Sequence, residues 1–152
     1  MRIAVDSSVL VALIDLRDIW RDQALALLDA LIDAHATPVY FDCVAAEAVS
    51  AATRRLREKG HAAEVHALLD RLNAQVSMEL LTWILPDAPD LYPQALGLIR
   101  ASSGELNFND ALIALACRER DIPAIASFDA DFDQITWLKR VAEPADIETI
   151  HE

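Results

Sequence analysis

The sequence is short of glycine, aromatic residues and cysteine. Three glycines among 152 residues, of which 54% are hydrophobic and 6% aromatic, argue against a fibrous or disordered chain. Alanine and leucine are abundant instead, which favours helices. The two cysteines, Cys43 and Cys117, lie far apart in apolar segments and show no metal-type Cys/His spacing. We interpret them as buried, reduced thiols of a cytosolic protein.

Long apolar runs are also lacking. No uncharged stretch approaches the roughly 20 residues that a membrane span needs. Asp6 and Asp15 interrupt the partly apolar N-terminus, and no small-residue cleavage site follows a charged leader, so we expect no signal peptide. These absences predict a soluble, cytoplasmic protein with no membrane partner.

Positive charge is scarce. The chain has 13 Lys and Arg residues against 25 Asp and Glu, which gives a formal net charge of −12. Such a surface does not favour binding of nucleic acid over its whole area. It suits cations, a basic partner, or a locally positive groove on an acidic body.

Apolar residues recur with strand and helix spacings in alternation. The predicted strands cover residues 2–5, 37–42, 122–127 and 135–141. The predicted helices begin near Ser7 or Ser8, each a possible cap, and then cover 19–35, 44–59, 62–80, 91–101 and 110–120, the last capped by Asn109. The length and this alternation predict one α/β domain over residues 1–152, with a short, mostly parallel central sheet flanked by helices.

Acidic residues stand at unusual places in this pattern. Asp6 and Asp129 each follow a predicted strand, and functional groups of parallel sheets gather beyond the carboxyl ends of strands. Glu47 lies on the apolar face of its predicted helix, where an unpaired carboxylate is costly. Asp110 begins another apolar helix. Carboxylates brought together in this way are the ligands that Mg²⁺ and Mn²⁺ prefer, and without metal their repulsion raises pKa values.

Each acid also has a simpler interpretation. Asp6 can cap a helix, Glu47 can reach water or pair with an arginine, and Asp110 can interact with the helix dipole for about 0.3–1 kcal/mol. Asp129 and the alternate aspartates after it, Asp131 and Asp133, can form a solvated turn. A calcium loop of the EF-hand type is excluded, because Gln134 stands where that loop needs glycine and Arg140 where it needs glutamate.

In these four regions the chain resembles the PIN-domain family, and more narrowly the VapC-type toxin ribonucleases of type II toxin–antitoxin systems. "VDSSVLVAL" is similar to the family's first strand and helix, "AAEAVSA" to its second motif, "NFNDALIALAC" to its third and "IASFDADFD" to its fourth. The family usually has Thr or Ser, one residue, Asp, and then a further Asp-Phe in the fourth motif. Ser127, Asp129 and Asp131-Phe132 stand there in this chain. The helices between Gly60 and Ser103 are less diagnostic.

The resemblance implies a PIN-like three-layer fold and metal-dependent hydrolysis of single-stranded RNA. It implies that Asp6, Glu47, Asp110 and Asp129 are catalytic and bind Mg²⁺ or Mn²⁺. Asp131 is a further metal ligand in this interpretation. A cognate antitoxin and a homodimer are the implied protein partners.

Side chains around these acids suggest supporting roles. The hydroxyls of Ser7 and Ser127 can orient a carboxylate or a water. Arg54 and Arg55, in the basic stretch "RRLREK", are predicted to bind the RNA backbone, with a solvated helix end as the alternative. An apolar helix face with Trp20, Leu27 and Leu31 is a candidate dimer or antitoxin surface, with ordinary core as the alternative. These latter alternatives stay open at the level of sequence.

Two other classes of function compete with a nuclease. A non-catalytic PIN-like binding module would share the fold and bind no metal. A phosphotransfer domain of the receiver or haloacid-dehalogenase kind also ends strands in aspartates, but it needs a lysine beside a nucleophilic aspartate. The only lysines, Lys59 and Lys139, do not end a predicted core strand.

Overall fold

A central sheet organises the computed structural model, which describes residues 1–151. The last residue of the predicted domain, Glu152, lies outside the described residues. The five strands lie in the order β3-β2-β1-β4-β5, and all four pairings are parallel. Their bounds are β1 Arg2–Val5, β2 Thr37–Phe41, β3 Leu81–Thr82, β4 Ala124–Ala126 and β5 Lys139–Val141. The predicted α/β class is confirmed, and the sheet is wholly parallel.

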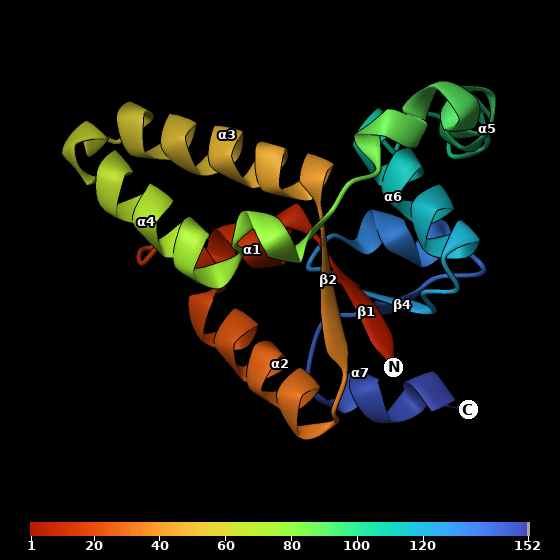
Figure 1. Ribbon diagram of the computed structural model, residues 1–152, viewed down its shortest axis with the longest axis horizontal. Coiled ribbons are helices and arrows are strands. Elements are labelled where there is room, and N and C mark those ends of the chain that lie inside the picture. Colours follow the sequence, from red (N-terminus) through yellow and green to blue (C-terminus); the bar gives the residue numbers. More distant parts are fainter. Residues whose placement is uncertain (152) are drawn as a thin grey trace.

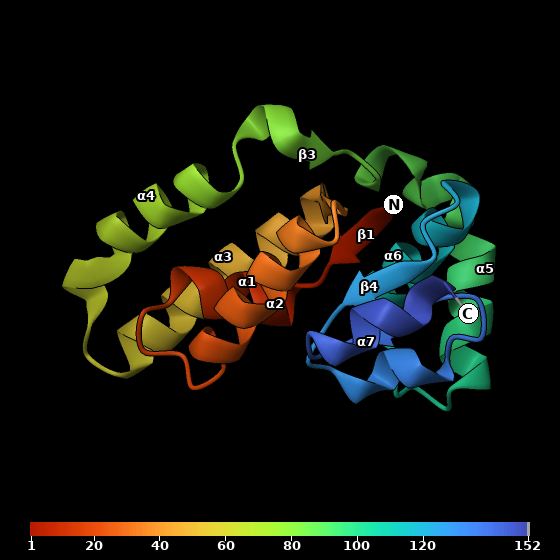
Figure 2. The same ribbon diagram turned by 90° about the horizontal axis from the view of Figure 1, so that it is seen from below.

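Helices cover this sheet. Their bounds are α1 Ser7–Ile14, α2 Arg21–Asp33, α3 Asp42–Glu58, α4 Val65–Gln75, α5 Ala88–Ala101, α6 Phe108–Glu119 and α7 Ala145–Glu148. Helices α1 to α4 gather toward one end of the molecule and α5 and α6 toward the other, with β1, β2 and β4 between them (Figures 1 and 2). Among residues 1–151, no helix is both long enough and apolar enough to cross a membrane.

The middle of the sheet is the centre of the core. In β1, the segment Ile3–Val5 is fully buried, and so is the whole of β4. Strands covered on both faces are expected to be continuously apolar, as these are. Helix α6 runs buried from Asp110 to Cys117, and the two predicted buried thiols, Cys43 and Cys117, are both free and buried.

The two central strands end side by side. Val5 pairs with Ala126 in the parallel register, and the Asp6 N–H donates to the Ala126 carbonyl (2.9 Å). Asp6 and Ser127 therefore lie together at the carboxyl edge of the sheet. The sequence predicted the same edge for Asp6 and Asp129.

Two predicted helix caps are wrong. Asp6, and neither serine, caps α1, because its carboxylate accepts from the Ser8 N–H. Asn107 caps α6 two residues before the predicted Asn109. Asp6 and Asn107 both have extended backbone geometry, as helix caps do, and several polar residues in a row offered equally good caps.

The predicted helix over 62–80 is also too long. Helix α4 ends at Gln75, Val76 is extended with φ −138°, and a single 3-10 turn, Met78–Leu80, leads into β3. Pairing of Tyr40 with Leu81 explains this end, because a strand there completes the sheet beyond β2. The predicted stop of the preceding helix at Gly60 is confirmed, with φ at +76°.

Candidate active site

Asp6 is the most firmly held of the predicted acids. It is buried, and its Oδ2 atom accepts from Ser8 Oγ (2.6 Å), Ser127 Oγ (2.9 Å) and the Ser8 N–H (3.2 Å). The helix-cap interpretation of Asp6 is thus correct, and the cap also fixes the carboxylate at the edge of the sheet. Three donors on one oxygen orient this group before any ligand arrives.

The two hydroxyls that hold Asp6 also shape the turn after β4. Ser127 Oγ accepts from the Asp129 N–H (3.0 Å), and Ser8 Oγ accepts from the Phe128 N–H (3.1 Å). Ser127 therefore links the carboxylate of Asp6 to the backbone of Asp129. Ser8 likewise links the carboxylate of Asp6 to the backbone of Phe128, and the sequence analysis did not name it as a site residue. The available signal was its position two residues after Asp6, the aspartate that follows β1.

The three alternate aspartates have different surroundings. Asp129 accepts from the Asp131 N–H (2.9 Å) and caps a short 3-10 helix, Ala130–Gln134. Asp133 is exposed and pairs with Arg140 through two bonds (2.7 and 2.9 Å), which lowers the pKa of the Asp133 carboxyl. The backbone N–H of Asp131 is the group that contacts Asp129. The turn therefore directs Asp129, and not Asp133, toward the other acids.

Glu47 comes from α3 and is half-buried. Burial raises the pKa of its carboxyl first, and the nearby charges of Asp6 and Asp129 raise it further. The nearby polar side chains of Asn109 and Ser7 partly oppose this rise. Ser7 thus contacts a predicted acid, and Asn109 is a second residue that the sequence analysis missed, because it was assigned to a helix cap.

Asp110 is held in a capping box at the start of α6. Its backbone N–H donates to Asn107 Oδ1 (3.0 Å), and its Oδ2 accepts from the Asn107 N–H (2.9 Å). Burial, followed by repulsion from Asp6, Asp129 and Glu47, raises the pKa of Asp110 to about 6, against a weaker opposing effect of the Asn107 bond.

These mutual effects place four carboxylates in one electrostatic neighbourhood. Each comes from a different element: the ends of β1 and β4, the second turn of α3 and the first turn of α6. Within residues 1–151, no three His, Cys, Asp or Glu side chains are drawn together into a ready-made metal centre. The donor set nevertheless fits Mg²⁺ or Mn²⁺, because these ions prefer oxygen ligands and Mg²⁺ keeps several waters between itself and the protein.

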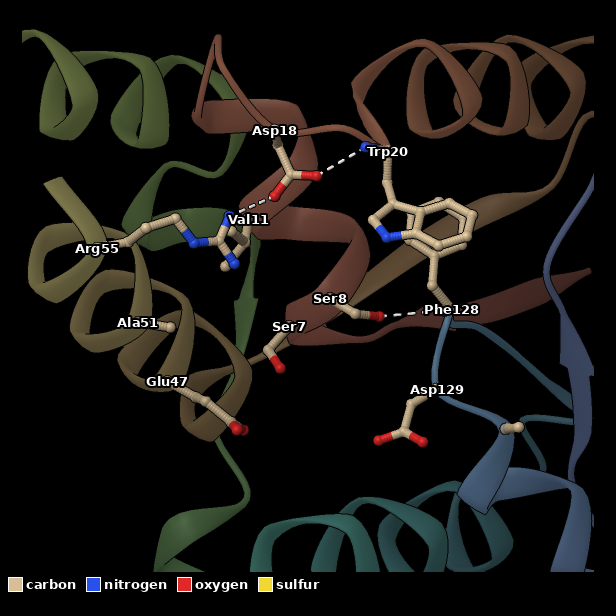
Figure 3. A pocket seen from close by; sticks show the side chains of 11 residues that line it. Ser7, Ser8, Val11, Asp18, Trp20, Glu47, Ala51, Arg55, Phe128 and Asp129 are labelled. Atoms are coloured by element: carbon tan, nitrogen blue, oxygen red, sulfur yellow. Dashed lines mark hydrogen bonds and ion pairs between the residues drawn. The ribbon is translucent and has the colours of Figure 1, made fainter. Parts of the chain in front are cut away.

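A pocket of about 440 Å³ opens beside the acids. Figure 3 shows the carboxylates of Glu47 and Asp129 on opposite sides of an open space, with Ser7 and Ser8 above the gap. Trp20 and Phe128 form another wall.

Of the two predicted RNA-binding arginines, one lines this pocket and the other does not. Arg55 lines it, one helix turn beyond Ala51, but its guanidinium pairs with Asp18 (2.5 Å) and Asp15 (3.5 Å). Arg54 is exposed in a separate hollow with Arg57 and Glu58. Binding of RNA by Arg54 and Arg55 stays a prediction. The pocket is lined from α3 by Glu47, Ala51 and Arg55, which follow one another at intervals of four residues.

The predicted apolar contact surface divides in the same way. Leu27 and Leu31 are fully buried, so they belong to the core, whereas 47% of Trp20 is exposed. The lysines stay outside the site: Lys59 is exposed at the end of α3, and Lys139 Nζ donates to the Thr149 carbonyl (2.8 Å). A phosphotransfer site, which needs a lysine beside its aspartate, does not fit this arrangement.

Comparison with known proteins agrees with the geometry. Two solved structures share the fold, each with a TM-score of 0.66. One is VapC20 of Mycobacterium tuberculosis, a sarcin–ricin loop cleaving toxin, at 23% identity over 89% of this chain and 95% of that one. The other is VapBC2 of Rickettsia felis, bound to a DNA fragment from its promoter, at 15% identity over 93% of this chain and 98% of that one.

The comparisons of sequence identify the family. No curated protein matches the chain significantly. The family model of the PIN domain matches residues 3–138. That span begins one residue into β1, includes β2, β3 and β4, and ends just before β5; it contains the four acids that gather at the carboxyl edge of the sheet. The chain therefore belongs to the PIN domain family.

Proposed function

We propose that this PIN domain, a single domain over residues 1–152, is an Mg²⁺- or Mn²⁺-dependent endoribonuclease that hydrolyses single-stranded RNA. The observation that supports the proposal is the convergence of four carboxylates from four elements, Asp6, Glu47, Asp110 and Asp129; the raised pKa of Asp110 agrees with it. Acids that destabilise one another in this way gain most from a shared cation.

In this proposal Asp6, Glu47, Asp110 and Asp129 hold the metal, and Asp131 supports Asp129 on the same turn. A bound divalent ion lowers the pKa of its water and so supplies a nucleophile near neutral pH. Ser127 and Ser8 keep Asp6 in one orientation, since both hydroxyls donate to the same oxygen. Ser7 and Asn109 orient Glu47, and Glu47, whose pKa is raised, is placed to accept a proton from a water in the pocket.

We further propose that the protein is the toxin of a toxin–antitoxin pair, with a cognate antitoxin and a homodimer as its assemblies. The resemblance of the four motifs to VapC-type toxins supports this, as does the likeness of the fold to VapC20 and VapBC2. The formal net charge of −12 and the acidic pocket suit an antitoxin segment that carries arginine or lysine.

The test is cleavage of a mixed RNA pool by purified protein, with and without Mg²⁺ or Mn²⁺, followed by mapping of the new ends. Asp129→Asn is the informative variant, because asparagine still caps the short 3-10 helix but removes one charge from the site. Asp133→Asn is its matched control, four residues along the same turn and paired with Arg140.

We expect metal-dependent cleavage by the parent protein and by Asp133→Asn, and a loss of at least about 100-fold in Asp129→Asn, as is typical when a group that stabilises the transition state is removed. No cleavage by the parent, combined with no heat of Mg²⁺ or Mn²⁺ binding in calorimetry, would leave a non-catalytic binding module. Cleavage that persists in a chelator and in Asp129→Asn would come from a contaminating nuclease.

A further inference from the structure

An aromatic pair forms the wall of the pocket next to the acids. Trp20 and Phe128 stack with their ring centroids 5.3 Å apart and their planes at 23°. Phe128 immediately precedes Asp129, and its backbone N–H donates to Ser8 Oγ (3.1 Å), the hydroxyl that also holds Asp6. The pair is therefore attached directly to the groups that position two of the proposed metal ligands.

Trp20 is fixed in place and still open to solvent. Its backbone N–H donates to Asp18 Oδ1 (2.8 Å), and it stands at the start of α2. Phe128 covers one face of the indole, yet 47% of the residue remains exposed. An exposed indole in a defined orientation offers a flat, apolar surface to a ligand at little cost in side-chain entropy.

The pocket connects this surface to the acids. Trp20, Phe128, Glu47 and Asp129 all line the same space of about 440 Å³, which falls in the range of small-ligand sites, about 300–1,000 Å³. Figure 3 shows the two rings overlapping on one side, with the Glu47 and Asp129 carboxylates on the other.

Charge decides which part of a nucleotide fits the aromatic wall. The cation that lines the pocket, Arg55, is engaged by the carboxylates of Asp18 (2.5 Å) and Asp15 (3.5 Å). Two acids around one arginine leave this wall with no positive excess, so it does not attract a phosphate. A planar uncharged group suits it better, because it gains contact with the indole and loses little solvation.

We propose that Trp20, backed by Phe128, is a stacking platform for a base of single-stranded RNA. The proposal rests on the proposed function, in which RNA is the substrate. The base lies on the exposed indole, and the adjoining phosphate points toward Glu47 and Asp129. Stacking on an aromatic ring tolerates every base, so Trp20 gives the position of the strand and not its sequence.

The test measures binding of two single strands that carry the same charge: a short oligoadenylate and an abasic ribose-phosphate strand of equal length. All proteins carry Asp129→Asn, which suppresses the proposed cleavage during the titration. The variants are Trp20→Leu, which keeps apolar area without an aromatic face, and Trp20→Phe. The matched control is Trp83→Leu, because Trp83 is also an exposed tryptophan (56%) but does not line the pocket.

We expect Trp20→Leu to bind oligoadenylate about 5- to 150-fold more weakly, the loss that removal of one base–aromatic stack gives. Trp20→Phe falls between the parent and Trp20→Leu. Affinity for the abasic strand stays the same in every variant, and Trp83→Leu behaves as the parent. Melting temperatures of the variants identify any loss that comes from misfolding.

Two results overturn the platform. One is equal binding of oligoadenylate by Trp20→Leu and Trp83→Leu, which would leave the aromatic pair as a surface for a protein partner. The other is an equal fall for both strands, which would mean that Trp20 acts through the local fold. Metal-dependent cleavage is measured separately, in proteins that retain Asp129. Cleavage by these proteins, with no change in oligoadenylate binding by Trp20→Leu, would contradict the platform and leave the nuclease standing. Weaker oligoadenylate binding by Trp20→Leu, with no cleavage, would contradict the nuclease and leave the platform standing.

Discussion

The pH dependence of stability in metal-free protein tests the electrostatics of the acid cluster. The pKa of Asp110 rises from 3.8 to about 6 on folding, because the group is buried among three other carboxylates. The folded state thus holds the Asp110 proton more tightly than the unfolded state does. This stabilisation is fully present below pH 3.8 and is lost as the pH rises through about 6.

The size of the effect follows from the shift. At about 1.4 kcal/mol per pH unit, the difference between the two pKa values corresponds to an upper value of about 3 kcal/mol. Solvent around the site screens the repulsion, so we expect about 1–2 kcal/mol. The Asp110→Asn variant has no such proton, while its amide oxygen can still accept the bond from the Asn107 N–H that closes the capping box.

The assay is urea unfolding in a chelator at several pH values between 4.5 and 7.5, for the parent and Asp110→Asn. The difference in unfolding free energy between the two proteins removes the contributions of all other titrating groups. We expect Asp110→Asn to gain about 1–2 kcal/mol on the parent as the pH rises across this range. If the difference in unfolding free energy stays constant with pH, burial and the neighbouring carboxylates do not raise the pKa of Asp110.

Three further predictions concern the groups around the acids. Added Mg²⁺ should stabilise the parent at pH 7.5 by about 2.7 kcal/mol at 100 times its dissociation constant, and an unchanged melting temperature with saturating Mg²⁺ and Mn²⁺ would exclude a metal site. Ser127→Ala removes one donor to Asp6 and a partner of the Asp129 N–H, so calorimetry should show Mn²⁺ affinity about 10-fold weaker or more, whereas equal affinity would deny Ser127 an orienting role. Asn107→Ala should cost about 0.5–2 kcal/mol in urea unfolding through loss of the α6 cap, and a cost near zero would show that the capping box contributes little.

Much of the fold can be predicted from the sequence, because a parallel sheet gives a simple alternation of short apolar strands and amphipathic helices. The short apolar strands that end at Asp6 and Ser127 are separated by amphipathic helices, and the rule that functional groups gather at the carboxyl edge brings the acids together without further information. The central strands and five of the six predicted helices lie close to their predicted positions. The exact ends depend on tertiary pairing, as at β3, which local periodicity does not contain.

In the candidate site, the sequence pointed to the acids and to the hydroxyls of Ser7 and Ser127. A carboxylate on an apolar face or at a strand end is conspicuous, because its burial has to be compensated. Ser8 and Asn109 are ordinary polar residues in sequence. Ser8 also accepts from the Phe128 N–H, and Asn109 lies beside Glu47, and both of these contacts join segments that are distant in the sequence. The pairing of Arg55 with Asp15 and Asp18 spans distant segments, so the sequence could not distinguish it from a free phosphate-binding arginine.

The claim that matters most is that Asp6, Glu47, Asp110 and Asp129 share a divalent cation. Anomalous diffraction from a crystal soaked in Mn²⁺ locates such an ion directly. The account predicts an anomalous peak at the carboxyl edge of the sheet, between the ends of β1 and β4 and the starts of α3 and α6, and its loss in Asp129→Asn. A peak elsewhere on the molecule, or none at saturating Mn²⁺, would contradict it.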